Sequence, residues 1–186
     1  MSLTLNKFVR MFFSVLFVAA ITGATANAEG IPPELEAKVK KYEDMLAKWA
    51  SDPDVVSAVK SANSKGGIIK GMTNIKWDEL PANDSKVTQF QKTKAAQKMD
   101  KWQTKDLAKL FLRDSRGDLV AGPSKPLIYN IKARPPFKNA QKGKPWHAPK
   151  AKPDPSTGDL SVQVSVPVME KGKVIGVLHT AVKHRK

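Results

Sequence analysis

The chain has 186 residues, of which 32 are Lys or Arg and 17 are Asp or Glu, so its formal net charge is +15 at pH 7. It contains no cysteine, which excludes disulfide bonds, thiolate metal sites and a cysteine nucleophile. The excess of positive charge favours attraction to anionic molecules or surfaces.

The first 28 residues have the pattern of a secretory signal peptide. Lys7 and Arg10 form a basic head, residues 11–21 are apolar, and small residues end in Ala26-Asn-Ala28. This apolar core of eleven residues is shorter than the roughly 20 residues that cross a bilayer as a helix. We therefore predict export to the periplasm with cleavage after residue 28, and an uncleaved N-terminal anchor is the alternative.

Cleavage would remove two cations and no acid, so residues 29–186 would carry a net charge of +13. This length is enough to bury the core of one domain. Across residues 33–50, apolar residues recur at spacings of three and four, which places them on one face of a helix. They are Leu35, Val39, Tyr42, Leu46 and Trp49.

A second helix is predicted directly afterwards, with Asp52 as its N-cap and Pro53 at its first position. Residues 63–67 should end it. Its buried side is expected to consist of Val55, Val56, Val59 and Ala62. Residues 66–81 are expected to be a loop with one helical turn near residues 75–80.

A third helix is predicted over residues 87–101, capped by Asp84 and Ser85. Its stripe is imperfect and consists of Val87, Phe90, Lys94, Ala95 and Met99. Helices come first and strands second in this chain, which predicts the α+β class rather than alternating strands and helices. The helical part is expected to span residues 29–104 and the sheet part residues 105–186.

Two hairpins make up the predicted sheet part. Residues 110–122 contain two apolar runs around Asp114-Ser-Arg-Gly117, and the tight turn needs a positive φ at Gly117. Residues 161–182 repeat this pattern around a turn at residues 170–173. Between the hairpins, residues 122–158 hold eight of the 13 prolines, which excludes long helices and central strands. An insert of this length is usually functional or disordered.

Several segments together resemble the PDC or single Cache periplasmic sensor domains. They are residues 52–63 (DPDVVSAVKSAN), 77–78 (WD), 111–121 (FLRDSRGDLVA), 162–168 (VQVSVPV) and 174–178 (VIGVL). The resemblance implies a long N-terminal helix packed along a PAS-like antiparallel sheet. It also implies a small-molecule pocket between the sheet and the loops that connect its strands.

The insert carries the candidate ligand-binding residues. Residues 119–153 contain eight Lys or Arg and no acid. Arg134 is the candidate anion clamp, because a guanidinium can hold a carboxylate or phosphate through two parallel hydrogen bonds; the alternative is a solvated surface arginine. Tyr129, Phe137 and Trp146 supply flat apolar surface that could wall a pocket, or could simply anchor the insert. After residue 159 the only acid is Glu170, which disfavours recognition of an ammonium group.

No motif indicates an enzyme, a metal site or a cofactor. His147, His179 and His184 lack the spacing of a metal-binding pair, and no nucleophile, P-loop or dinucleotide pattern occurs. His179 lies in the last predicted strand, where a structural role is favoured over a place in the pocket.

Two functions remain open on the sequence. The first is an exported sensor that binds a small anionic molecule and reports its occupancy to a membrane receptor or histidine kinase. The alternative is a periplasmic protein that binds polyanions or the anionic envelope surface through the Lys-rich residues 125–152. The long helices could also pair two copies into a homodimer.

Overall fold

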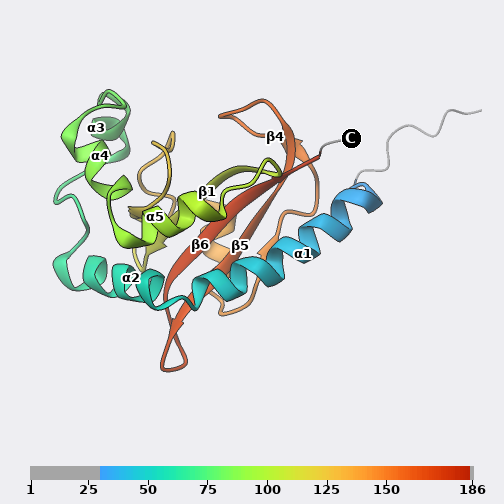
Figure 1. The fold of residues 1–186 in the computed structure, drawn as a ribbon, viewed down its shortest axis with the longest axis horizontal. Helices are drawn as coiled ribbons and strands as arrows, with labels where there is room; N and C mark the ends of the chain where they lie inside the picture. Colours follow the sequence, from blue (N-terminus) through green and yellow to red (C-terminus); the bar gives the residue numbers. More distant parts are fainter. Residues whose placement is uncertain (1–29, 185–186) are drawn as a thin grey trace, which may run out of the picture.

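The computed structural model describes residues 30–184 (Figure 1). The predicted signal peptide lies outside these residues. The elements are α1 (Pro33–Ala50), α2 (Pro53–Lys65), α3 (Asn74–Asp78), α4 (Ser85–Gln91), α5 (Lys94–Trp102), β1 (Leu107–Asp114), β2 (Leu119–Ala121), α6 (Pro135–Ala140), β3 (Trp146–His147), β4 (Lys152–Pro153), β5 (Leu160–Glu170) and β6 (Lys173–Lys183). Within the described part of the chain, no helix has the length and apolar character needed to cross a membrane.

The first two helices form as their patterns predict. The side chain of Asp52 accepts a hydrogen bond from the backbone N–H of Asp54 at 2.9 Å, which caps α2. The stripe of α1 is buried from Leu35 to Leu46. Its last member, Trp49, is half-buried and stacks on Trp102 of α5, with the ring centroids 5.1 Å apart.

The prediction of one helix over residues 87–101 is wrong, because two short helices occupy this stretch. α4 ends at Gln91, and α5 begins only at Lys94. The break has a local cause: Thr93 adopts an extended backbone and its hydroxyl accepts a hydrogen bond from the N–H of Ala96 at 3.1 Å, so it caps a new helix. The single helical turn expected near residues 75–80 is present as α3.

The strands form one antiparallel sheet in the order β2-β1-β6-β5-β3, with β4 also paired to β5. Gly117 in the β1–β2 turn has a φ of 86°, and a Cβ there would lie 2.7 Å from the backbone nitrogen of Lys132. Glycine is therefore required at this turn for both conformation and space. The predicted α+β class, with N-terminal helices over an antiparallel sheet, is confirmed.

Successive side chains of each strand point to opposite faces of the sheet, so the two faces carry different residues. On β5, Val162, Val164 and Val166 belong to the main core with Leu35 and Leu46 of α1. The helices α1, α2 and α5 therefore cover one side of the sheet, the near side in Figure 1. The residues between these valines point to the opposite side, where the insert lies.

The insert packs back onto the sheet, as three contacts show. Trp77 of α3 donates its indole N–H to the carbonyl of Pro126 at 2.7 Å, and both groups are buried. Ser165 of β5 donates its hydroxyl to the carbonyl of Pro136 at 2.8 Å. At the far end of the insert, Lys109 of β1 forms a salt bridge with Asp154. These contacts make the insert a cover over the second face of the sheet.

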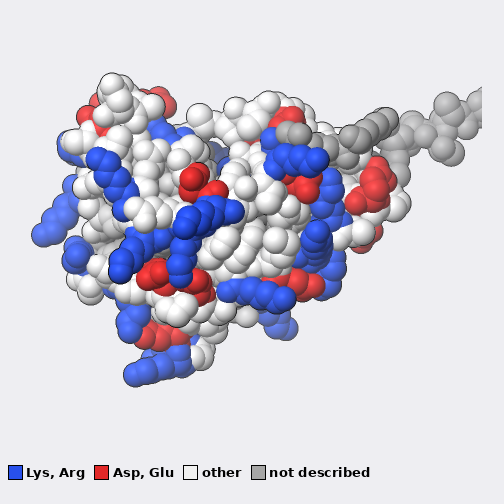
Figure 2. All heavy atoms as spheres, in the orientation of Figure 1, with Lys and Arg blue, Asp and Glu red and all other residues white. Residues whose placement is uncertain are grey.

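Charge is distributed differently on the two sides. Figure 2 shows the face formed by α1, α2 and α5, where Lys and Arg side chains lie among Asp and Glu side chains. Several of these pairs are salt bridges, such as Lys98 with Asp52 and Asp54 and Lys60 with Glu170. The acid-free stretch belongs to the opposite side, so the unbalanced positive charge lies with the insert.

Candidate functional site

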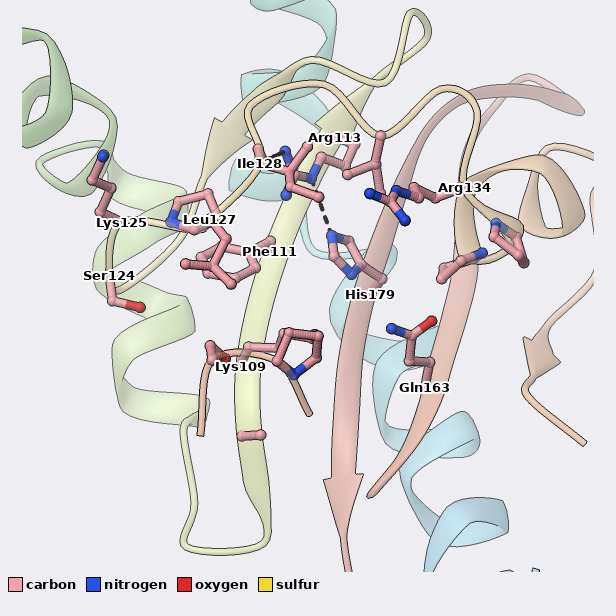
Figure 3. A pocket seen from close by; sticks show the side chains of 17 residues that line it. Lys109, Phe111, Arg113, Ser124, Lys125, Leu127, Ile128, Arg134, Gln163 and His179 are labelled. Carbon is pink, nitrogen blue, oxygen red and sulfur yellow. Dashed lines mark hydrogen bonds between the residues drawn. The ribbon is translucent and has the colours of Figure 1, made fainter. Parts of the chain in front are cut away.

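A cavity of about 350 Å³ lies between the insert and the second face of the sheet (Figure 3). Ligand sites typically have volumes of roughly 300–1,000 Å³. Its floor comes from three neighbouring strands and its roof from the insert. The lining residues used below are Lys109, Phe111 and Arg113 of β1, Gln163 of β5, His179 of β6, and Lys125, Leu127, Ile128 and Arg134 of the insert. None of the described residues that line the cavity is Asp or Glu.

Arg113 is the central polar group of the floor. It is only 1% exposed. Its Nη1 donates to the carbonyl oxygens of Ile128 at 3.2 Å and Tyr129 at 2.5 Å, and its Nε donates to Nε2 of His179 at 3.0 Å. The guanidinium carbon also lies 5.5 Å from the ring centroid of Phe111.

The charge of Arg113 has no carboxylate in contact with it. Among residues 30–184, no Asp or Glu forms a salt bridge with this side chain. Burial lowers its pKa to about 9, although Tyr129, Asp118 and Asp114 oppose this shift. The guanidinium therefore remains charged at neutral pH, and it places a desolvated cation in the wall of the cavity.

His179 holds a neutral imidazole beside this cation. Burial lowers its pKa well below the ordinary value of 6.5, and the positive charges of Arg113 and Lys109 add to the shift. Because its Nε2 accepts a hydrogen bond from Arg113, the proton of the neutral ring lies on Nδ1. The histidine thus combines the structural role favoured from the sequence with a place in the cavity wall.

Further cations lie in the roof. Arg134 is exposed, sits at the N-cap position of α6 and lines the cavity. The ammonium of Lys125 lies 5.4 Å from the ring centroid of Trp77, a cation–π contact. Lys109 is positive as well, but its salt bridge with Asp154 balances its charge. The charged side chains named above that line the cavity are therefore all cations.

The four residues singled out from the sequence lie in different places. Arg134 lines the cavity. Phe137 is buried against Ile131 and lines an open groove next to the cavity. Trp146 lines a second cavity beyond β5. Tyr129 is buried beside Trp77, with the ring centroids 5.3 Å apart.

Tyr129 takes part in the site through its backbone, because its carbonyl oxygen accepts the hydrogen bond from Arg113. Its hydroxyl is buried without a hydrogen-bond partner among the described residues. Burial, together with the charges of the nearby Asp118 and Asp114, raises the pKa of this phenol to about 12. The side chain therefore stays neutral and supports the roof from outside the cavity.

The sequence reasoning missed Arg113, Lys109 and Gln163 as members of the site. The signal that could have found them is period two: residues 109, 111 and 113 share one face of β1, opposite to the core residues Leu110 and Leu112. Because Lys109 and Arg113 share the face of β1 that carries Phe111, this face combines charged and apolar side chains, as the wall of a ligand site does. No cluster of three or more His, Asp or Glu that could hold a metal ion occurs in the described part of the chain.

Comparison with known proteins finds likenesses at the level of structure alone. No family model and no curated protein matches the chain. The match to the sensor domain of the Vibrio cholerae histidine kinase DctB covers 81% of this chain and 57% of the DctB chain, with 16% identity and a TM-score of 0.46.

Two ligand-binding domains of chemoreceptors match as well. The match to the ligand-binding domain of Campylobacter jejuni Tlp3 in complex with 4-methylisoleucine covers 82% of this chain and 61% of the Tlp3 chain, with 16% identity and a TM-score of 0.41. That of Pseudomonas aeruginosa PctC in complex with GABA has 15% identity, a TM-score of 0.38 and the same coverage. The chain thus spans less than two thirds of the length of these structures. All three are named as sensor or ligand-binding domains.

Proposed function

We propose that residues 29–186 form one Cache-like sensor domain, exported to the periplasm, that binds a small anionic molecule in the cavity of Figure 3. The bound state would be read by a separate membrane receptor or histidine kinase. The signal-peptide pattern of residues 1–28 supports export. The kind of protein found by structural comparison supports a ligand-binding role.

The observation that carries this proposal is the buried charge of Arg113, which forms no salt bridge with an Asp or Glu of residues 30–184 and is opposed only from a distance by Asp114 and Asp118. A buried cation is costly unless a counter-charge or strong hydrogen bonds compensate it. Two carbonyl oxygens and a neutral imidazole compensate it in part. A carboxylate or phosphate in the cavity would supply the missing charge, and the exposed Arg134 could hold it from the roof.

The proposal is tested by calorimetry on the mature chain with small monocarboxylates, amino acids and inorganic phosphate. We expect one anionic class to bind, and Arg134→Ala to weaken that binding by at least about tenfold, the size expected for a lost hydrogen bond to a charged group. Lys142→Ala is the control, because it removes the same charge from an exposed position in the insert that lies outside this cavity.

Either of two results would contradict the anion site. One is that no anion binds to the mature chain. The other is that Arg134→Ala and Lys142→Ala weaken binding equally, which would indicate a general effect of net charge.

A second candidate function rests on the open groove next to the cavity. Among the described residues, three cations line this groove, Lys132, Arg134 and Lys138, and no acid does. Such a surface suits polyanions of the envelope. Salt separates the two functions, because polyanion binding weakens steeply with ionic strength whereas a buried site is screened much less.

The position of the cavity supports a relay of ligand occupancy. β5 and β6 carry Gln163 and His179 on the cavity side, and they carry Val164 and Leu178 into the core with α1 on the other side. A shift of these strands would therefore displace the core residues that pack against α1, and α1 would move with them. The partner that reads this shift is expected at the surface of the helices.

A further inference from the structure

A second cavity, of about 380 Å³, lies beyond β5 under the later part of the insert. Its apolar lining residues are Trp146, Ala148 and four prolines: Pro135, Pro149, Pro153 and Pro155. Its acid, Asp154, is buried and paired with Lys109. Its two lysines, Lys150 and Lys152, are exposed. This second cavity therefore offers an apolar space with cations at its surface.

The two cavities share part of their walls. Pro135, Pro155 and Gln163 line both of them. In Figure 3 the side chain of Gln163 lies on the floor, on the side of the first cavity away from Phe111. The two cavities therefore adjoin at Gln163.

Strand pairing explains why the cavities lie side by side. Trp146 of β3 is paired with Ser165 of β5, and Ser165 is paired with His179 of β6. Paired residues point to the same face of a sheet, and residues two apart on one strand do so too. Trp146, Ser165, Gln163 and His179 thus share the face under the insert.

The residues that line the two cavities differ in their chemistry. The first contains Arg113 and the exposed Arg134, which suit an anionic group. The second is lined by the half-buried Trp146 and by prolines, a surface that suits an alkyl chain or an aromatic ring. The Lys109–Asp154 salt bridge lies at their border, since Lys109 lines the first cavity and Asp154 the second.

From this we infer that the ligand is an elongated amphipathic carboxylate rather than a compact anion. Its carboxylate lies at Arg113 and Arg134, and its apolar tail crosses Gln163 to reach Trp146 in the second cavity. This inference rests on the proposed function, because it takes the first cavity as the anion site. It names the ligand class of that site and makes Trp146 a specificity-determining residue.

The test is a series of straight-chain acids, acetate, butyrate, hexanoate and octanoate, titrated into the mature chain by calorimetry. Each buried methylene should tighten binding by roughly fourfold, and this gain should continue through octanoate. Ala148→Leu places a larger side chain in the second cavity, where Ala148 is half-buried. In this variant butyrate should bind as in the wild type, whereas octanoate should bind at least about tenfold more weakly.

Two further variants control this experiment. Ala133→Leu adds the same volume at an exposed site outside both cavities and should leave the whole series unchanged. Trp146→Ala removes the aromatic wall and should also weaken octanoate selectively, so it replaces Ala148→Leu if that variant fails to fold.

The outcomes separate the two proposals. Failure of every acid to bind overturns the anion site and this inference with it. If butyrate binds through Arg134 but affinity stops rising with chain length, the anion site stands and the elongated ligand is refuted. A gain with length that neither Ala148→Leu nor Trp146→Ala reduces also refutes it, because the tail would then lie elsewhere.

Discussion

The salt bridge between Lys109 and Asp154 joins the sheet to the insert, and its removal should destabilise the fold. The side chain of Asp154 is 1% exposed and that of Lys109 16%. The carboxylate also accepts hydrogen bonds from the backbone N–H of Ser156, at 2.9 Å, and from the hydroxyl of the same residue. Asp154→Asn keeps the size of the side chain but removes the charge that faces Lys109.

The expected loss of stability follows from this geometry. Breaking a buried salt bridge costs about 3–5 kcal/mol, because the remaining charge stays buried without a partner. Lys109 keeps some access to water, which lets its ammonium regain part of its hydration. We therefore expect Asp154→Asn to lower the free energy of unfolding by about 2–3 kcal/mol, a large share of the roughly 5–15 kcal/mol of a typical domain.

The pH dependence gives a second measure of the same pair. Burial alone would raise the pKa of Asp154, but the hydrogen bonds from Lys109 and Ser156 outweigh it and lower the pKa below the ordinary 3.8. A carboxyl with a lowered pKa stabilises the fold above its unfolded-state pKa, and this contribution is lost as the pH falls through the folded-state value. Asp154→Asn should therefore reduce the loss of stability in acid.

Urea denaturation of the single variants and of the double variant with Lys109→Met measures the coupling between the two residues. Glu170→Gln is the control, because it removes a partly exposed salt bridge with Lys60 and should cost less than about 1 kcal/mol. The reasoning would be refuted if Asp154→Asn cost no more than this control. Additive effects of the Lys109 and Asp154 variants would refute it as well.

Two further predictions concern the sheet. The pKa of His179 is lowered in the folded state, so as the pH falls this histidine is protonated in the unfolded chain before it is protonated in the folded one. The free energy of unfolding therefore decreases below about pH 6.5, by up to about 1.4 kcal/mol per pH unit. His179→Gln should flatten this slope in thermal or urea unfolding between pH 7 and 5, and an unchanged slope would contradict the assignment. Gly117→Ala should cost more than Gly158→Ala, since both have a positive φ but only Gly117 would bring a Cβ against backbone, at 2.7 Å from Lys132; strain in this region is of order 1–3 kcal/mol. Equal melting temperatures would show that the contact with Lys132 does not matter.

The elements that sequence reasoning predicted well are those with a strong local signal. α1 and α2 each combine a regular apolar period with a proline or Asp start, and the β1–β2 turn depends on one glycine with positive φ. The break between α4 and α5 was missed because Thr is a weak helix former that still occurs inside helices, so Thr93 alone does not predict a break. Only its hydrogen bond to Ala96 decides that it starts a new helix.

The site was predicted less completely, for a physical reason. Arg134 stood out because it lies in an acid-free stretch, and the structure places it on the cavity. Arg113 did not stand out, because it lies in a strand between an apolar run and a turn, where an exposed strand end is the ordinary expectation. Its burial depends on Ile128 and Tyr129, 15 and 16 residues away, which accept its hydrogen bonds. A cavity formed by such distant contacts leaves little trace in local sequence.

Under the proposed function, the hydrogen bonds of Arg113 would connect anion binding to the position of the insert. The same guanidinium lines the cavity and holds the carbonyl groups of Ile128 and Tyr129. An anion that draws hydrogen bonds from Arg113 competes with these carbonyls, whereas one that also engages Arg134 pulls the roof towards the sheet. Because the insert is fixed at Trp77 through Pro126 and at Ser165 through Pro136, the segment between these points would take up the change. Occupancy of the cavity would therefore alter the insert and the strand that carries His179, which is the coupling that a sensor requires.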